Sequence, residues 1–211
     1  MRYRSLLLVA FFLYIASPVS ANIITYNVTV DTSSISGTMG SIDFQFNPGP
    51  LVTQPATLQI LDFSTDGALN PPPFPTGDAT GVLPGPLSFD NLSGLNDYFE
   101  PFTYGAMLSF DVSISSTPGG TSGSVFAFSM FSDAAGTVPT LTSDTADGFA
   151  LTVGVNVDAT ATVTPFSLQT IAVPAETSVP EPGSFALLGA ALACPGLLFI
   201  FRRRILVRRQ E

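Results

Sequence analysis

The sequence predicts an all-β protein built as one antiparallel β-sandwich with a jelly-roll-like arrangement. Segments in which apolar and polar residues alternate recur along the chain, which is the period-2 pattern of strands with one buried face. Eighteen glycines and eighteen prolines favour frequent turns between these segments. No window has a convincing soluble-helix pattern, and roughly eight to ten short strands at regular spacing favour a sandwich, with a barrel as the alternative.

Four segments alternate clearly and are predicted to be half-buried strands: 22–31, 40–47, 106–115 and 149–158. In 106–115, for example, Leu108 and Phe110 fall on one face, whereas Ser109 and Asp111 fall on the other. By the same pattern we expect Ile42, Phe44 and Phe46 to point into the core, and Ser41, Asp43 and Gln45 to point outward.

The remaining segments are less regular. Segments 57–64 and 125–131 are more continuously apolar, as central strands can be, and 161–173 reads as one strand or two with a bend at Pro165. The proline-rich segment 70–86 is predicted to be a long loop, because proline donates no ladder hydrogen bond. Segment 115–124 reads as a flexible turn that would make 106–115 and 125–131 hairpin partners.

The charges are distributed very unevenly. All seven basic residues are arginines near the two ends, and the chain has no histidine and no lysine. Between residues 22 and 178 there are fourteen acidic residues, which is sixteen minus Glu181 and Glu211. The body can therefore form no side-chain ion pair, a nucleic-acid backbone would be repelled, and a cation would be attracted.

Two acidic loop residues, Asp144 and Asp147, precede Gly148, and the favoured interpretation is that this Asp-Gly sequence makes a turn. The alternative is a Ca²⁺ site, for which Asp144 and Asp147 are the candidate ligands. No other cofactor is expected.

The residue types predict that the body is not an enzyme. A serine or cysteine nucleophile would lack a histidine base, and the single cysteine, Cys194, lies near the C-terminus. Asp31-Thr32-Ser33 is the nearest approach to an aspartic-protease triplet. A glycosidase needs only two suitably spaced carboxylates, so it stays a minor alternative.

The N-terminal residues 1–21 have the organisation of a signal peptide. Arg2 and Arg4 precede an apolar run over residues 5–15, and small residues then lead to a predicted cleavage between Ala21 and Asn22. An uncleaved anchor is the alternative, although the apolar run is short for a membrane span.

The C-terminal residues 179–211 contain an apolar stretch that is long enough to span a membrane, unlike the apolar run at the N-terminus. Residues 183–201 carry no charge and, as a helix, would extend about 28 Å at 1.5 Å per residue, close to the thickness of a hydrocarbon core. Arg202, Arg203 and Arg204 follow at once and are expected to stop transfer. The tail 202–211 would then stay in the cytoplasm while the body, residues 22–173 with a linker at 174–178, is exported.

The order of Val179-Pro180-Glu181-Pro182, an apolar span and an arginine cluster resembles the PEP-CTERM sorting signal. This resemblance implies a Gram-negative host that makes extracellular polysaccharide. It also implies transient anchoring in the inner membrane and processing near the motif by the transpeptidase exosortase. A plain tail anchor is the alternative. The body, through residues 40–47 and 126–133, is also similar to a recurring kind of PEP-CTERM protein for which no activity is implied.

Together these features predict a secreted protein of the cell surface or extracellular matrix, with a structural or adhesive role in exopolysaccharide or biofilm. A carbohydrate-binding module is the alternative, with Tyr98 or Tyr104 as its aromatic platform.

Overall fold

The computed structural model describes residues 21–175, and these residues form an antiparallel β-sandwich, as predicted. The described part contains thirteen strands and one short 3₁₀ helix, η1, at Ser33–Ile35. The strands are β1 Asn22–Asp31, β2 Met39–Pro48, β3 Ala56–Thr65, β4 Ala68–Leu69, β5 Phe74–Thr76, β6 Thr80–Gly81, β7 Leu87–Asp90, β8 Asp97–Thr103, β9 Met107–Ser116, β10 Ser124–Phe131, β11 Phe149–Val155, β12 Ala161–Pro165 and β13 Thr170–Pro174.

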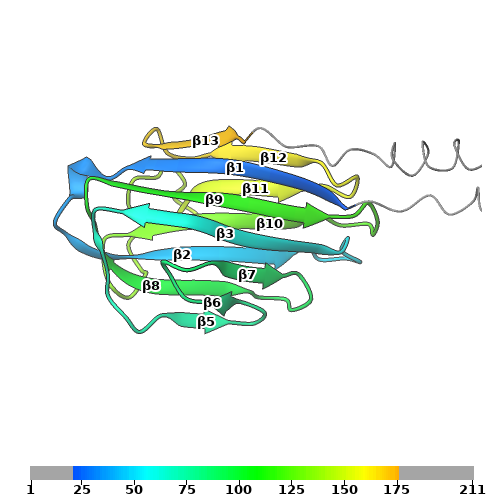
Figure 1. Ribbon diagram of the computed structural model, residues 1–211, viewed down its shortest axis with the longest axis horizontal. Coiled ribbons are helices and arrows are strands. Elements are labelled where there is room, and N and C mark those ends of the chain that lie inside the picture. The colour runs from blue at the N-terminus through cyan, green and yellow to red at the C-terminus, as the bar shows by residue number, and fades with distance from the viewer. Residues whose placement is uncertain (1–20, 176–211) are drawn as a thin grey trace, which may run out of the picture. The chain divides into compact units, whose positions relative to one another are not determined.

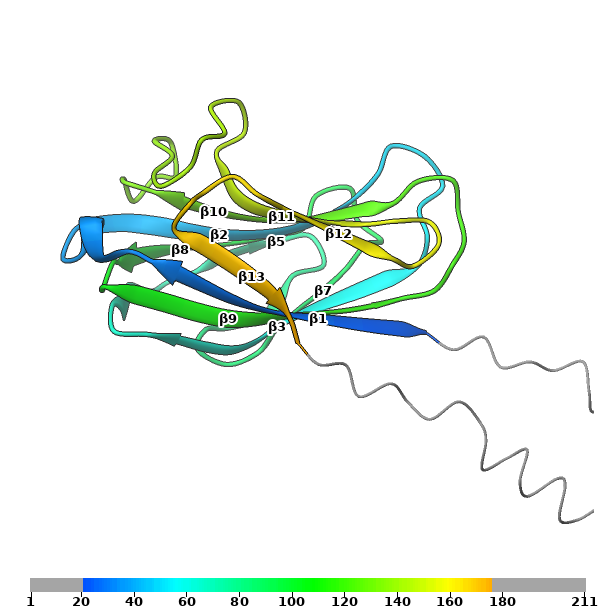
Figure 2. The same ribbon diagram turned by 90° about the horizontal axis from the view of Figure 1, so that it is seen from above.

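The strands form two sheets that pack face to face (Figure 2). Sheet A has the order β13-β1-β9-β3-β7-β6, and sheet B has the order β12-β11-β10-β2-β8-β4, with β5 also paired to β8. The pairing of β3 with β9 is nested in sequence between the paired strands β2 and β10, so distant segments are joined in both sheets.

One predicted pairing is wrong. The segments 106–115 and 125–131 correspond to β9 and β10, which belong to different sheets and therefore are not hairpin partners. Each instead pairs with strands far away in the sequence: β9 with β1 and β3, and β10 with β2 and β11. Residues 117–123 thus cross from sheet A to sheet B rather than making a tight turn.

Apolar side chains from the inner faces of both sheets form a single core. Phe44 of β2 lies at its centre, with its ring centroid 5.1 Å from that of Phe110 in sheet A and 5.1 Å from that of Phe128 in sheet B. The predicted inward residues Leu108, Phe110, Val112 and Ile114 are all buried. Because no disulfide or ion pair links the described residues, burial of these apolar side chains is the main source of stability.

The irregular segments resolve into short strands. Segment 161–173 forms two strands, β12 and β13, and the bend lies after Pro165. The proline-rich segment 70–86 is mostly loop but contains the short strands β5 and β6 at the margins of the sheets. Strands β7 and β8 were not predicted from the sequence.

Both ends of the described chain lie near the first strand. The backbone N–H of Ala175 donates to the carbonyl oxygen of Thr25 at 2.8 Å, three residues from the start of β1. The connections 32–38, 104–106, 132–148 and 166–169 gather at the opposite end, where β1 finishes (Figure 1). None of the described residues forms a helix that could cross a membrane, and the predicted span 183–201 lies outside the described residues.

Candidate functional site

The outer face of sheet B carries a row of polar side chains along β2. The amide of Asn47 donates to Gln45 Oε1 at 3.3 Å, and the amide of Gln45 donates to Asp43 Oδ2 at 2.7 Å. Ser41 continues the row and donates to the carbonyl oxygen of Asp133 at 2.9 Å. We call Ser41, Asp43, Gln45 and Asn47 the polar row.

Contrary to the prediction, the polar row is not a solvated face. Ser41 is fully buried and Asp43 is only 6% exposed, while Gln45 is half-buried. The period-2 pattern assigned these side chains correctly to the face opposite the core, but other segments of the chain cover that face.

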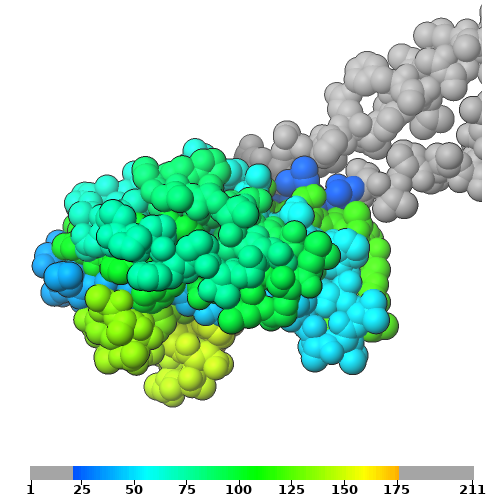
Figure 3. Space-filling view, turned by 90° about the horizontal axis from the view of Figure 1, so that it is seen from below, coloured from blue at the N-terminus to red at the C-terminus, as the bar shows by residue number. Residues whose placement is uncertain are grey.

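Three phenylalanine rings and the 132–148 connection make this cover. Phe99 of β8 lies across from Asp43 in the sheet, and its ring contacts those of Phe74 and Phe131, with centroids 6.3 Å and 6.5 Å away. Gly136 rests on the ring of Phe99 so closely that a Cβ at this position would lie 2.6 Å from a ring carbon. The connection stands out from the sheet B side of the body (Figures 2 and 3).

Beneath this cover, two carboxyl groups face each other. Asp97 of β8 pairs with Gln45 in the sheet, so it lies diagonally across from Asp43 on the same face. The two carboxyl groups are within hydrogen-bonding reach of each other. In the part of the chain that the structure describes, Oδ1 of each is buried and accepts no hydrogen bond.

This environment raises the pKa of Asp43 strongly, to about 9. Desolvation by burial is the largest cause, followed by the neighbouring carboxyl group of Asp97 and its charge, while the hydrogen bond from Gln45 acts in the opposite direction. Residues 22–175 contain no basic residue, so this part of the chain supplies no positive side chain to the pair.

A second carboxyl group is buried on the inner face of sheet B. Glu100 is 1% exposed and accepts a 2.6 Å hydrogen bond from the Tyr98 hydroxyl, which in turn accepts the backbone N–H of Leu83 at 3.1 Å. Burial raises the pKa of Glu100. Burial is also the largest cause that raises the pKa of Tyr98. This pair joins β8 to the loop between β6 and β7, which contains Leu83.

The aromatic platform proposed for a carbohydrate is not available. Tyr98 is 0% exposed and Tyr104 is 1% exposed, so neither ring face can stack on a sugar. The Tyr104 hydroxyl lies 2.7 Å from the carbonyl oxygen of Ser41 and 3.1 Å from that of Phe131, which links the connection before β9 to sheet B.

The predicted calcium ligands Asp144 and Asp147 lie in the 132–148 connection. Asp144 accepts backbone N–H groups from Ala146, Asp147 and Phe149 at 3.0, 3.3 and 3.1 Å, and these bonds lower its pKa against the opposing desolvation. Its carboxylate therefore organises the turn. Among the described residues, no three or more His, Cys, Asp or Glu side chains are grouped to hold a metal ion.

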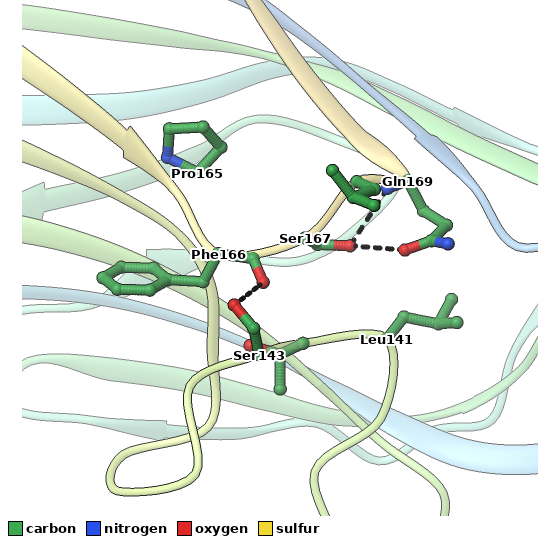
Figure 4. A pocket seen from close by; sticks show the side chains of 8 residues that line it. Leu141, Ser143, Pro165, Phe166, Ser167 and Gln169 are labelled. Atoms are coloured by element: carbon green, nitrogen blue, oxygen red, sulfur yellow. Dashed lines mark hydrogen bonds between the residues drawn. The ribbon is translucent and has the colours of Figure 1, made fainter.

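An open hollow of about 480 Å³ lies between the 132–148 connection and the turn after β12. Figure 4 shows Ser143 directed at the carbonyl oxygen of Phe166, to which its hydroxyl donates at 2.7 Å, and Ser167 bonded to Gln169. The ring of Phe166 and the exposed Leu168 give the hollow apolar surface beside these polar groups.

The remaining predicted sites lie at the ends of the chain. Asn22 begins β1, and its amide donates to the carbonyl oxygen of Ala159 at 3.0 Å, so the predicted cleavage after Ala21 falls just before the first strand. The sorting residues Val179–Pro182 and the stop residues Arg202–Arg204 lie outside the described residues.

Comparison with protein families identifies the C-terminal signal. The PEP-CTERM protein-sorting motif matches residues 178–204, which include both Val179–Pro182 and Arg202–Arg204. The chain is thus an exported surface or extracellular protein and a substrate of exosortase. Its C-terminal part carries the PEP-CTERM sorting domain. Neither the curated proteins nor the solved structures gave a match, and the similarity of the body to other PEP-CTERM proteins stays a prediction.

Proposed function

We propose that the sandwich is a non-catalytic structural or adhesive component of the cell surface or extracellular matrix, in contact with exopolysaccharide. The sorting motif at residues 178–204 carries this proposal, because it gives the body an extracellular destination. The transient anchor in the inner membrane and the release of the body near Pro182 belong to the same proposal.

The chemistry of the body supports a non-catalytic role. It has no histidine, lysine, arginine or cysteine between residues 22 and 175, so carboxylates are its only strongly acidic or basic groups at neutral pH. Several carboxylates stabilise loops by accepting backbone N–H groups of the same loop. Asp133 accepts the N–H groups of Thr137 and Val138, and Asp158 accepts the N–H group of Thr160.

The carboxyl pair on sheet B and the buried Glu100 are also poor catalytic candidates. Asp43 and Asp97 are within hydrogen-bonding reach, whereas the two carboxyl groups of a glycosidase are about 5–9.5 Å apart. Glu100 lies in the core with its carboxyl group bonded to Tyr98.

The described part of the sandwich has two different ends. Ala175, the last described residue, is bonded to Thr25 near the start of β1. The 132–148 connection and the hollow beside Phe166 lie at the other end, where β1 finishes. We propose this end as the contact with polysaccharide.

The sorting part of the proposal is tested by fractionation with C-terminal mapping. In cells with exosortase, we expect the body outside the cell with its C-terminus near Pro182. Without exosortase, we expect an intact precursor in the inner membrane. A mature protein that keeps residues 183–211 in exosortase-positive cells would favour the plain tail anchor.

The matrix part needs a separate experiment. Cells that lack the protein should form a less cohesive matrix, and the wild-type gene should restore it. A variant with Phe166→Ala and Gln169→Ala should be exported normally but retained less by purified exopolysaccharide. If the exported double variant is retained as well as the wild type, the hollow does not bind exopolysaccharide. If the matrix of the deletion strain is unchanged, the protein has no structural role in the matrix.

A further inference from the structure

We propose that Asp43 and Asp97 form a binding site for a hard divalent cation, Ca²⁺ foremost, on the covered outer face of sheet B. This site is distinct from the Asp144 and Asp147 pair, because those residues lie in the 132–148 connection and the carboxylate of Asp144 is already bonded to backbone N–H groups.

The first observation is the unused hydrogen-bonding capacity of the pair. Asp43 is 6% exposed, and its Oδ2 receives the amide of Gln45, but its buried Oδ1 has no hydrogen-bond partner among the described residues. Oδ1 of Asp97 is likewise buried without a donor. Buried polar atoms in native proteins nearly always have a partner, so two such oxygens at one place indicate a missing ligand.

The second observation is that hydrogen bonds from neighbouring side chains hold Asp43 in place. The polar row fixes Asp43 through Gln45, and Gln45 through Asn47, whose Oδ1 accepts the backbone N–H of Asn96 at 2.7 Å. Supporting hydrogen bonds of this kind hold a ligating carboxylate in one orientation. Ser129 of β10 lies directly across from Asp43 and is 2% exposed, so a neutral hydroxyl group lies on the same face.

Electrostatics favour a cation over an unaccompanied pair. One proton shared between the carboxyl groups would relieve the repulsion. Keeping this proton at neutral pH lowers the free energy of unfolding, because the same carboxyl group in the unfolded chain ionises near pH 4. Neither Lys, Arg nor His is present from residue 22 to residue 175 to balance the charge. A cation at this pair would therefore come from the solution outside the cell, to which the sorting motif directs the body.

The geometry and ligand type suit a hard cation. Carboxylate and hydroxyl oxygens are the ligands that Ca²⁺ and Mg²⁺ prefer. Two neighbouring ligands of one Ca²⁺ ion, each at about 2.4 Å and at a right angle, are about 3.4 Å apart. Asp43 and Asp97 lie at diagonal positions on one face of sheet B, so their carboxyl groups can reach one ion. Water would complete the coordination from the side of Asp97, which is half-buried.

The test measures thermal unfolding of the full-length chain in detergent, after treatment with EDTA, with Ca²⁺ or Mg²⁺ added at pH 7. We expect Ca²⁺ at a hundredfold excess over its Kd to raise the Tm by about 5 °C or more. Asp43→Asn and Asp97→Asn should each abolish this shift. Asp111→Asn, on the exposed face of sheet A, and Asp144→Asn should each retain it.

A second measurement follows Ca²⁺ binding directly. Isothermal titration calorimetry of the metal-free wild-type protein at pH 7 should show Ca²⁺ binding at one site per chain, and Asp43→Asn should abolish the binding heat.

Three results would overturn the proposal. They are an unchanged Tm of the wild type with both cations, a Tm shift that persists in both Asp43→Asn and Asp97→Asn, and a Tm shift lost in Asp144→Asn alone. The last result would assign the cation to the 132–148 connection instead.

Discussion

The outer faces of the two sheets have the same kind of sequence but opposite environments. On sheet A, Asn27 donates to Asp111 at 2.6 Å in an exposed pair, and Thr25 lies 3.4 Å from Ser113. On sheet B, the polar row is covered by Phe99, Phe131 and the 132–148 connection. Alternation in the sequence therefore decides which face of the sheet a side chain lies on. Whether that face is exposed to solvent depends on segments that are distant in the sequence and can cover it.

Substitutions on the inner faces of the sheets should lower the free energy of unfolding more than substitutions on either outer face. Phe44→Ala removes a fully buried ring that contacts Phe63, Phe110 and Phe128. We expect a loss of about 3–5 kcal/mol in the free energy of unfolding, measured by urea denaturation. A loss below about 1 kcal/mol would contradict the assignment of Phe44 to the centre of the core.

The carboxyl pair on sheet B should show the next largest effect, with the opposite sign. Asp43→Asn supplies a neutral amide that can donate to Asp97, so the metal-free protein should become more stable at pH 7 by about 1–3 kcal/mol. Urea denaturation in EDTA measures this change. A destabilised variant would show that the ionised pair is favourable without a cation.

The same pair predicts a pH dependence. The pKa of Asp43 is raised in the folded protein, so the native state keeps a proton that the unfolded chain releases near pH 4. The free energy of unfolding of the metal-free protein should therefore fall as the pH rises from about 4 toward 9. In Asp43→Asn this decline should be largely lost. Below pH 4 the lowered pKa values of Asp133 and Asp144 act in the opposite sense, because stability is lost when these loop carboxylates become protonated.

The cover over sheet B can be weakened separately. Gly136 has a φ of 70°, and a Cβ there would lie 2.6 Å from the Phe99 ring, whereas Gly37 has a φ of 80° and no atom within 4 Å of an added Cβ. Both Gly→Ala changes force alanine into a left-handed conformation at a cost of about 1 kcal/mol. Gly136→Ala should cost about 1 kcal/mol more than Gly37→Ala in urea denaturation. Equal costs would show that the connection does not rest on Phe99.

The exposed pair on sheet A should show the smallest effect. Asp111→Ala removes a hydrogen bond that is accessible to water, so the free energy of unfolding should change by less than about 0.5 kcal/mol. A loss above about 1 kcal/mol would remove the contrast between the two outer faces.

Much of the fold was predictable because most long strands carry their own pattern. The alternation around Leu108 and Phe110 predicts β9, and it does so whichever strands lie beside it. Strand β8 was missed because Glu100 occupies an inner position and Pro101 interrupts the apolar pattern. The false hairpin between β9 and β10 arose because closeness in sequence says little about pairing when a connection crosses between sheets.

The candidate site on sheet B could be predicted only in part. The sequence placed Asp43 on the face opposite the core, but neither the nearness of Asp97 nor the cover by Gly136 and Phe99 has a local signal. Residues 126–133, singled out beside 40–47, form most of the strand that pairs with this segment, with Ser129 opposite Asp43. The sorting signal, by contrast, was fully readable, because its order of motif, apolar span and arginines is a property of the linear chain.

The most direct test of the account is the titration of the Asp43 carboxyl group, followed by its ¹³C chemical shift in the metal-free protein. We expect Asp43 to be still protonated at pH 7 and saturating Ca²⁺ to remove this proton. If Asp43 instead ionises near pH 4 in the absence of metal, the desolvated carboxyl pair on the outer face of sheet B would be wrong.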